Sequence, residues 1–173
     1  CYYRMTDTLK MVSVFRQLVD VYPESKEASD AQFSIGDFYY NAQSYDSARI
    51  AYQKILDKYP AYARVEEAKE LVRELSQITA YREYEAGMRS FDDKDYATPI
   101  TKLESVVHKY PDADVVSASE VNIASAYEQI GERERALKLF EEIIKKYSPV
   151  STAQTIVFFA ELHRRWIESG RTE

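Results

Sequence analysis

Apolar and polar residues alternate along most of the chain with the period of an α-helix. In four segments, 15–21, 52–58, 103–109 and 140–146, apolar side chains recur at positions i, i+3 and i+4. This spacing gathers them on one face of a helix and leaves the opposite face polar. The pattern therefore predicts amphipathic helices that bury one face against neighbouring helices.

A short helix-ending signal follows each of these segments. Tyr-Pro occurs at Tyr22-Pro23, Tyr59-Pro60 and Tyr110-Pro111, and the fourth segment ends in Tyr147-Ser148-Pro149. Proline stops a helix because it lacks a backbone N–H and clashes with the preceding turn. Successive signals lie 37, 51 and 37 residues apart, so the sequence predicts a repeated helical unit with one longer interval.

Within each unit, small and large side chains follow a known order. The clearest copy contains Gln32, Ile35, Gly36, Tyr39, Ala48, Tyr52 and Pro60. Two further copies contain Tyr84, Ala86, Gly87, Leu103 and Pro111, and then Ile123, Ala124, Tyr127, Ala136 and Phe140. This order resembles the tetratricopeptide repeat over nearly the whole chain. The resemblance implies an all-α fold, with antiparallel helical hairpins stacked as a right-handed solenoid.

The repeats predict a division of the chain into four parts. Residues 1–61 hold a partial repeat and one full repeat, 62–79 an extra or extended helix, 80–150 two repeats, and 151–173 the first helix of a further repeat or a terminal cap helix. The second part accounts for the longer interval, because the sequence has no Gly or Pro between Tyr62 and Ala86. We expect an extra helix at about 62–78, or one helix that continues to about residue 91.

A proline departs from the motif in the second of the three copies. Pro99 stands where the repeat has a small residue. Proline is tolerated at the first position of a helix, where its missing N–H has no partner to lose. We therefore expect this helix to begin late, with Thr98 as its N-cap and Pro99 as its first residue.

The two ends of the chain resemble partial repeats. Residues 1–3 align with 38–40, inside the first helix of a repeat, and Leu162, His163 and Trp166 fit the first helix of another. We therefore expect the chain to be part of a longer solenoid. The alternative for Cys1 is the acylated N-terminus of a lipoprotein.

Composition and motifs exclude several classes of function. The 173 residues carry a net charge of −6, which repels phosphate backbones, so no nucleic-acid partner is predicted. The longest apolar run, 155–160, is too short to span a bilayer, and no transmembrane segment is expected. A single Cys and two His, at 108 and 163, leave little for metal or triad chemistry, and both His are interpreted as solvated or packed side chains. Since no phosphate-binding or metalloprotease motif occurs, we predict no enzymatic activity, cofactor or metal.

The resemblance also implies a binding surface. In tetratricopeptide proteins, the first helix of each repeat lines the concave face and contacts the partner. The matching positions here are Phe33, Asp37, Tyr40, Asn41, Tyr81, Tyr84, Met88, Phe91, Val121, Ser125 and Glu128. No Lys or Arg is among them, which disfavours an acidic C-terminal tail as the partner. The alternative is that Phe33, Tyr84 and Phe91 fill gaps between successive hairpins.

These features predict a non-catalytic scaffold that binds a partner peptide or protein domain and belongs to a larger complex. The 37-residue spacing with Tyr-Pro resembles bacterial cell-envelope tetratricopeptide proteins of the barrel-assembly lipoprotein and Tol–Pal coordinator types. That resemblance implies the periplasm or cell envelope. The alternative is a regulatory or targeting module of a larger enzyme, or a cytoplasmic adaptor.

Overall fold

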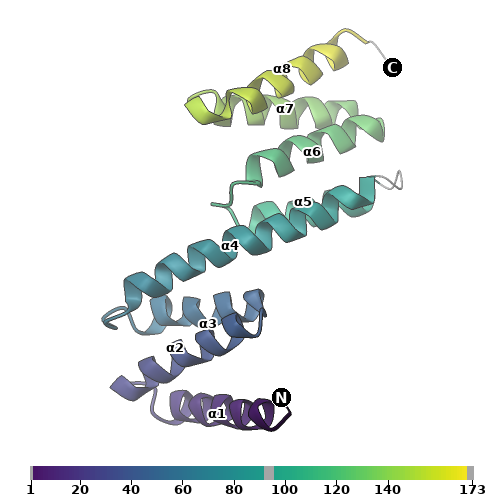
Figure 1. Ribbon diagram of the computed structural model, residues 1–173. Helices are drawn as coiled ribbons and strands as arrows, with labels where there is room; N and C mark the ends of the chain where they lie inside the picture. The colour runs from purple at the N-terminus through teal and green to yellow at the C-terminus, as the bar shows by residue number, and fades with distance from the viewer. Residues whose placement is uncertain (1, 92–95, 171–173) are drawn as a thin grey trace. The chain divides into compact units, whose positions relative to one another are not determined.

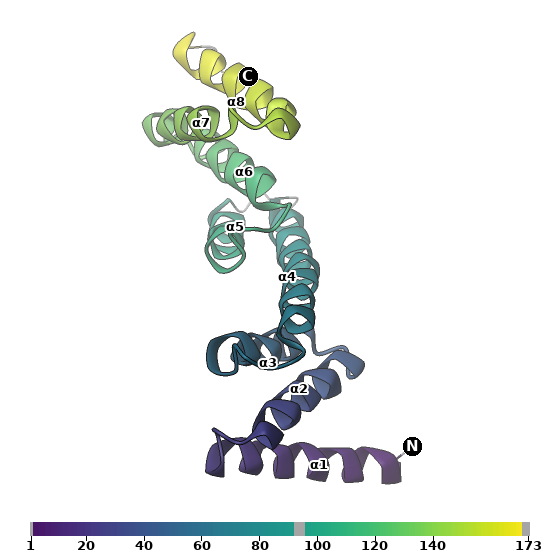
Figure 2. The same ribbon diagram turned by 90° about the vertical axis from the view of Figure 1, so that its left-hand side faces the viewer.

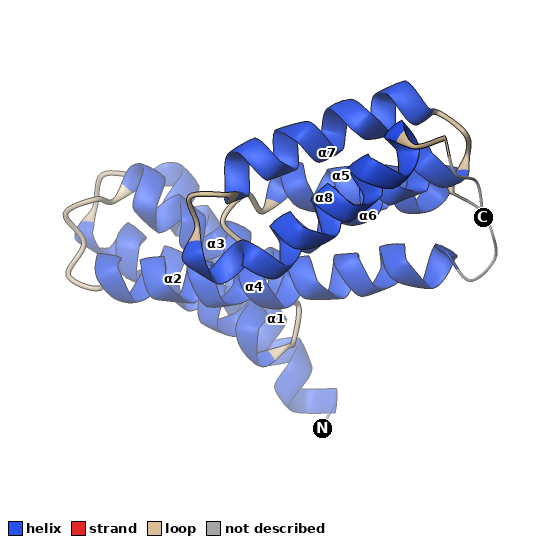
Figure 3. Cartoon of the chain, turned by 90° about the horizontal axis from the view of Figure 1, so that it is seen from above, coloured by secondary structure: helices blue, strands red, loops and turns tan. Residues whose placement is uncertain are grey.

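The computed structural model describes residues 2–91 and 96–170, with side chains from residue 10 onward. Helices make up all of its regular structure, and these described residues include no strand (Figures 1 and 3). The α-helices are α1 (Tyr2–Val21), α2 (Lys26–Asn41), α3 (Tyr45–Lys58), α4 (Val65–Met88), α5 (Ala97–Lys109), α6 (Val116–Gln129), α7 (Arg133–Tyr147) and α8 (Gln154–Glu168). Two short 3-10 turns cover Arg89–Phe91 and Ser151–Ala153. The predicted all-α fold is confirmed, whereas Cys1 lies outside the described residues.

The chain forms two compact units, Cys1–Thr79 and Ala80–Glu173, whose boundary falls inside α4. In the first unit α1 packs on α2 and α2 on α3; in the second α5, α6, α7 and α8 pack each on the next (Figure 2). Within each unit, consecutive helices are joined by short turns and run in opposite directions (Figure 1). The helices therefore pair as hairpins in the order in which they occur in the sequence.

The Tyr-Pro signals end their helices as predicted. α3 ends at Lys58 and α5 at Lys109, in each case two residues before the proline. The tyrosine N–H still donates back into the helix, from Tyr59 to the Ile55 carbonyl (2.8 Å) and from Tyr110 to the Val106 carbonyl (3.0 Å). The next residue is proline, which has no N–H to continue the pattern.

The segment after Pro60 forms a single helix. α4 runs without a break from Val65 to Met88, followed by the 3-10 turn Arg89–Phe91. Of the two arrangements expected for this segment, the continuous helix is therefore the one that forms. Helix-favouring residues and the absence of glycine before Gly87 allow this length.

The predicted start of the following helix was wrong by two positions. α5 begins at Ala97, so Thr98 lies inside its first turn instead of serving as the N-cap. Pro99 is the third helical residue and is buried. None of the first four N–H groups of a helix has an intrahelical acceptor, so proline fits there as well as at the first position.

The core of the first unit forms where α2 and α3 approach most closely. The ring of Tyr52 lies against Gly36, and a Cβ at that position would be 2.6 Å from Cδ1 of the ring. The Tyr52 hydroxyl donates to Asp37 Oδ1 at 2.6 Å. Burial, together with this carboxylate, raises the pKa of Tyr52. One side chain therefore fills the gap between the helices and fixes their register.

Replacing Gly36 with alanine tests this contact. Gly36→Ala should lower the free energy of unfolding by about 1–3 kcal/mol through overpacking, although alanine favours a helix by about 1 kcal/mol. Gly87→Ala is the matched control, because no atom would lie closer to its Cβ than Leu103 Cδ2, at 3.0 Å. Urea unfolding followed by circular dichroism measures both. A Gly36→Ala protein as stable as the parent would contradict the packing described here.

Candidate functional site

Three helices of the second unit present side chains to a common surface. Asn122 Nδ2 on α6 donates to the hydroxyl of Tyr84 on α4, at 3.2 Å. Glu128 on α6 lies 2.6 Å from Nδ1 of His163 on α8. These contacts connect residues 38 and 35 positions apart in the sequence, and they align one side of α6 with α4 and α8.

The α4–α6 face, as we call it, consists of Tyr81, Tyr84, Met88, Asn122 and Ser125. Helical spacing of three or four residues places the first three on one stripe of α4 and the last two on one stripe of α6. Tyr81 is 54% exposed, whereas Tyr84 and Met88 are partly buried against the core of the unit. Ser125 Oγ is buried and has no hydrogen-bond partner among the described residues. This face therefore combines accessible aromatic surface with an unused polar group.

An aromatic cluster holds α8 against this side of the unit. The ring of His163 stacks on Phe159 and on Phe140, with centroids 4.2 Å and 5.4 Å away, and Trp166 lies at 5.0 Å. The side chains of His163 and Glu128 are only 14% and 19% exposed. The interpretation of His163 as a packed side chain is confirmed. Glu128 was predicted to contact a partner, and its Oε2 lies next to Nδ1 of His163.

Two residues predicted for partner binding belong to the core. Phe33 is 1% exposed and lies edge-on to Tyr52, with ring centroids 5.1 Å apart. Val121 is 6% exposed and belongs to the main apolar cluster of the second unit. A partner could not contact side chains covered to this extent, so both predictions were wrong. For Phe33 the alternative, a gap-filling residue, holds.

The remaining predicted residues lie at or near the surface. In the first unit Asp37 accepts the Tyr52 hydrogen bond, the ring of Tyr40 is 6.1 Å from that of Tyr45, and Asn41 is exposed. In the second, Phe91 is partly buried with its ring 6.0 Å from that of Tyr96. Their role in binding stays a prediction. Asn122 was missed because its partner, Tyr84, is far away in the sequence.

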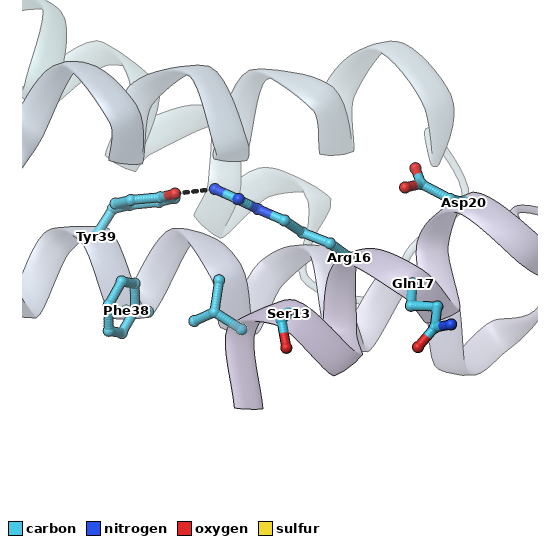
Figure 4. Close-up of a pocket in the computed structure, with 7 residues that line it drawn as sticks. Ser13, Arg16, Gln17, Asp20, Phe38 and Tyr39 are labelled. Atoms are coloured by element: carbon cyan, nitrogen blue, oxygen red, sulfur yellow. Dashed lines mark hydrogen bonds between the residues drawn. The ribbon is translucent and has the colours of Figure 1, made fainter. Parts of the chain in front are cut away.

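The first unit has a groove between α1 and α2 that includes none of the predicted residues. It encloses about 390 Å³ and is lined by Val12, Ser13, Arg16, Gln17, Asp20, Phe38 and Tyr39. Figure 4 shows Arg16 reaching from α1 to donate a hydrogen bond to the hydroxyl of Tyr39 on α2. The guanidinium also lies 5.8 Å from the centre of the Tyr39 ring. Both interactions join α1 to the hairpin of α2 and α3.

Two kinds of site are absent from the part of the chain that the structure describes. Among its residues, no three His, Cys, Asp or Glu side chains lie close enough to hold a metal ion. Within the same residues, no helix combines the length and the apolar character needed to cross a bilayer.

Comparison with known families finds two similar segments. Two models, each described as tetratricopeptide repeat, match residues 12–63 and 118–148. These two segments are similar to tetratricopeptide repeats. The first match spans α2 and α3 with the latter part of α1, and the second covers most of α6 and all of α7. No curated protein matches the chain. Tetratricopeptide repeats generally mediate protein–protein interactions and are typically non-catalytic.

Removing His163 tests how α8 is held in this repeat protein. His163→Ala should lower the free energy of unfolding by about 2–3 kcal/mol, because stacking with Phe140 and Phe159 and the contact with Glu128 are lost. Trp166, the only tryptophan, reports the change through its fluorescence during urea unfolding. Arg165→Ala, at a side chain 69% exposed, is the control and should change the value by less than about 0.5 kcal/mol. Equal effects of the two substitutions would contradict this account.

Proposed function

We propose that this protein is a scaffold that binds a segment of a partner protein on the α4–α6 face of its second unit. The observation that carries the proposal is the combination of exposed Tyr81 with the buried, unpartnered Oγ of Ser125. Tetratricopeptide repeats generally bind proteins, and this supports the class of partner.

The chemistry of the face favours a partner segment with apolar side chains and a free hydrogen-bond donor or acceptor. Tyrosine rings bury a large area at a low entropic cost and keep a hydroxyl for hydrogen bonding. Met88 adds an adaptable apolar contact. The α4–α6 face has no cationic side chain, so we do not expect it to select an acidic tail. Asp37, Tyr40 and Asn41 are proposed as a further contact region on the first unit.

We also propose that the partner belongs to a complex of the bacterial cell envelope. The support is the 37-residue spacing with its Tyr-Pro signals, a pattern similar to envelope tetratricopeptide proteins. A cytoplasmic adaptor, or a module of a larger enzyme, is the alternative. The identity of the proteins captured in the experiment below distinguishes these two cases.

The two tyrosines provide the first test. Tyr81→Ala with Tyr84→Ala should reduce capture of the partner from native lysate by about tenfold or more, because two aromatic contacts are removed. Quantitative mass spectrometry compares the captured proteins with those bound by the unmodified chain. The control is Tyr22→Ala with Ile130→Ala, at side chains 62% and 44% exposed, which removes apolar area elsewhere. Loss with the control pair and retention with the tyrosine pair would place binding on another surface.

Ser125 provides a second test. Ser125→Ala should leave the stability of the free protein unchanged or slightly raised, since its buried Oγ makes no hydrogen bond there. We expect rotation of the Ser125 side chain to bring Oγ to the surface when the partner binds. The substitution should therefore weaken binding of the captured partner by about fivefold, because the hydrogen bond formed only in the complex is lost. Isothermal titration calorimetry with the purified partner measures the affinity, and thermal unfolding measures stability. An unchanged affinity would remove Ser125 from the binding surface.

A further inference from the structure

The second unit has another depression, on the opposite side of α6. It encloses about 270 Å³ between α5, α6 and α7, and its floor is formed by Val107, Ile123, Leu139 and Ile143. We call it the α5–α7 pocket. On a helix of roughly 3.6 residues per turn, Ile123 lies on the other side of α6 from Ser125. The pocket is therefore separate from the α4–α6 face.

Charged side chains line the same pocket, and most of them are acidic. Glu104 comes from α5, Glu120 from α6, and Glu142 and Lys146 from α7. Three carboxylates against one ammonium group give the lining a net negative charge. An apolar floor beside this charge suits a side chain with an aliphatic stem and a cationic end.

The single cation of the lining is already engaged. Lys146 Nζ donates to Glu120 Oε1 at 2.7 Å and lies 4.9 Å from the centre of the Tyr147 ring. The other oxygen, Glu120 Oε2, is buried and accepts no hydrogen bond from any described residue. A carboxylate that is partly withdrawn from water is weakly screened and attracts a cation more strongly than an exposed one.

The other two carboxylates are only weakly held. Glu104 Oε1 accepts from the Tyr127 hydroxyl at 3.5 Å, the limit of a hydrogen bond. Glu142 is 61% exposed and 4.0 Å from Lys138. Both can therefore turn toward an arriving cation at little cost, since a hydrogen bond at its limiting distance and an exposed ion pair each contribute little to stability.

We propose that the α5–α7 pocket binds a lysine or arginine side chain of a partner protein, with the aliphatic stem on the apolar floor and the cation among the carboxylates. This inference does not depend on the α4–α6 face. It gives the protein a second contact with a stated chemistry: a basic residue next to an apolar one.

Two short peptides test the proposal on the intact chain. Acetyl-Leu-Arg-amide should cause saturable chemical-shift changes in the amide NMR signals of Ile123, Leu139 and Ile143. Acetyl-Leu-citrulline-amide has nearly the same shape without the charge, and it should bind about tenfold more weakly. Equal binding of the two peptides would overturn the proposal, because charge would then play no part. Shifts that do not saturate, or that spread over the acidic surface, would also overturn it.

Single substitutions test whether the arginine peptide binds in the α5–α7 pocket. Glu120→Gln should weaken binding of the arginine peptide by about tenfold, and Tyr84→Ala should leave it unchanged. Thermal unfolding shows whether the loss of the contact with Lys146 disturbs the fold. If it does, Glu142→Gln tests the proposal instead. This substitution should weaken binding by about threefold without affecting stability, because the Glu142 carboxylate is exposed. Full binding by a folded Glu120→Gln protein would overturn the proposal.

Discussion

The close approach of α2 and α3 at Gly36 is the constraint on which the first unit depends. Because position 36 has no side chain, the Tyr52 ring can lie flat in the space between the helices and become 1% exposed. The same ring contacts Phe33, and its hydroxyl is hydrogen-bonded to Asp37. A single aromatic side chain thus sets both the distance and the register of the hairpin. Phe33, Ala68 and Leu75 join the same cluster and extend it from this hairpin to α4.

In the second unit, different side chains allow two helices to pack closely. Ala124 and Phe140 are both fully buried, so a small residue on α6 again accompanies a large one on α7. α8 is then added through His163, which stacks on Phe140 and meets Glu128. The hydrogen-bonding geometry of the polar pair beside the aromatic stack restricts the orientation of α8 more than apolar packing alone would. The pair of His163 and Glu128 therefore helps to fix the position of α8 on α6.

Local signals in the sequence were sufficient to predict the helices, but not the surface. The apolar period and the Tyr-Pro signals act within one helix, and α3 and α5 end where these signals occur. Pro99 misled the prediction of a helix start, because several positions of the first turn tolerate proline equally well. Phe33 and Val121 occupy motif positions that face a partner in other repeats. Whether such a side chain is exposed depends on how large the residues of the neighbouring helices are. Asn122 and Tyr84 meet only after folding, since 38 positions separate them.

The period of α6 allows one helix to serve two surfaces of different chemistry. Asn122 and Ser125 lie on one side with Tyr81 and Tyr84 nearby on α4, where the side chains are neutral. Glu120 and Ile123 lie on the other side, where carboxylates surround an apolar floor. The residues between them, such as Ala124 and Ala126, are fully buried and keep the two sides apart. We propose that the neutral face selects aromatic and apolar contacts and the acidic pocket a cation, so a partner that carries both kinds of side chain would be held from two directions. Two such contacts on one rigid helix restrict the orientation of the partner more than either contact alone.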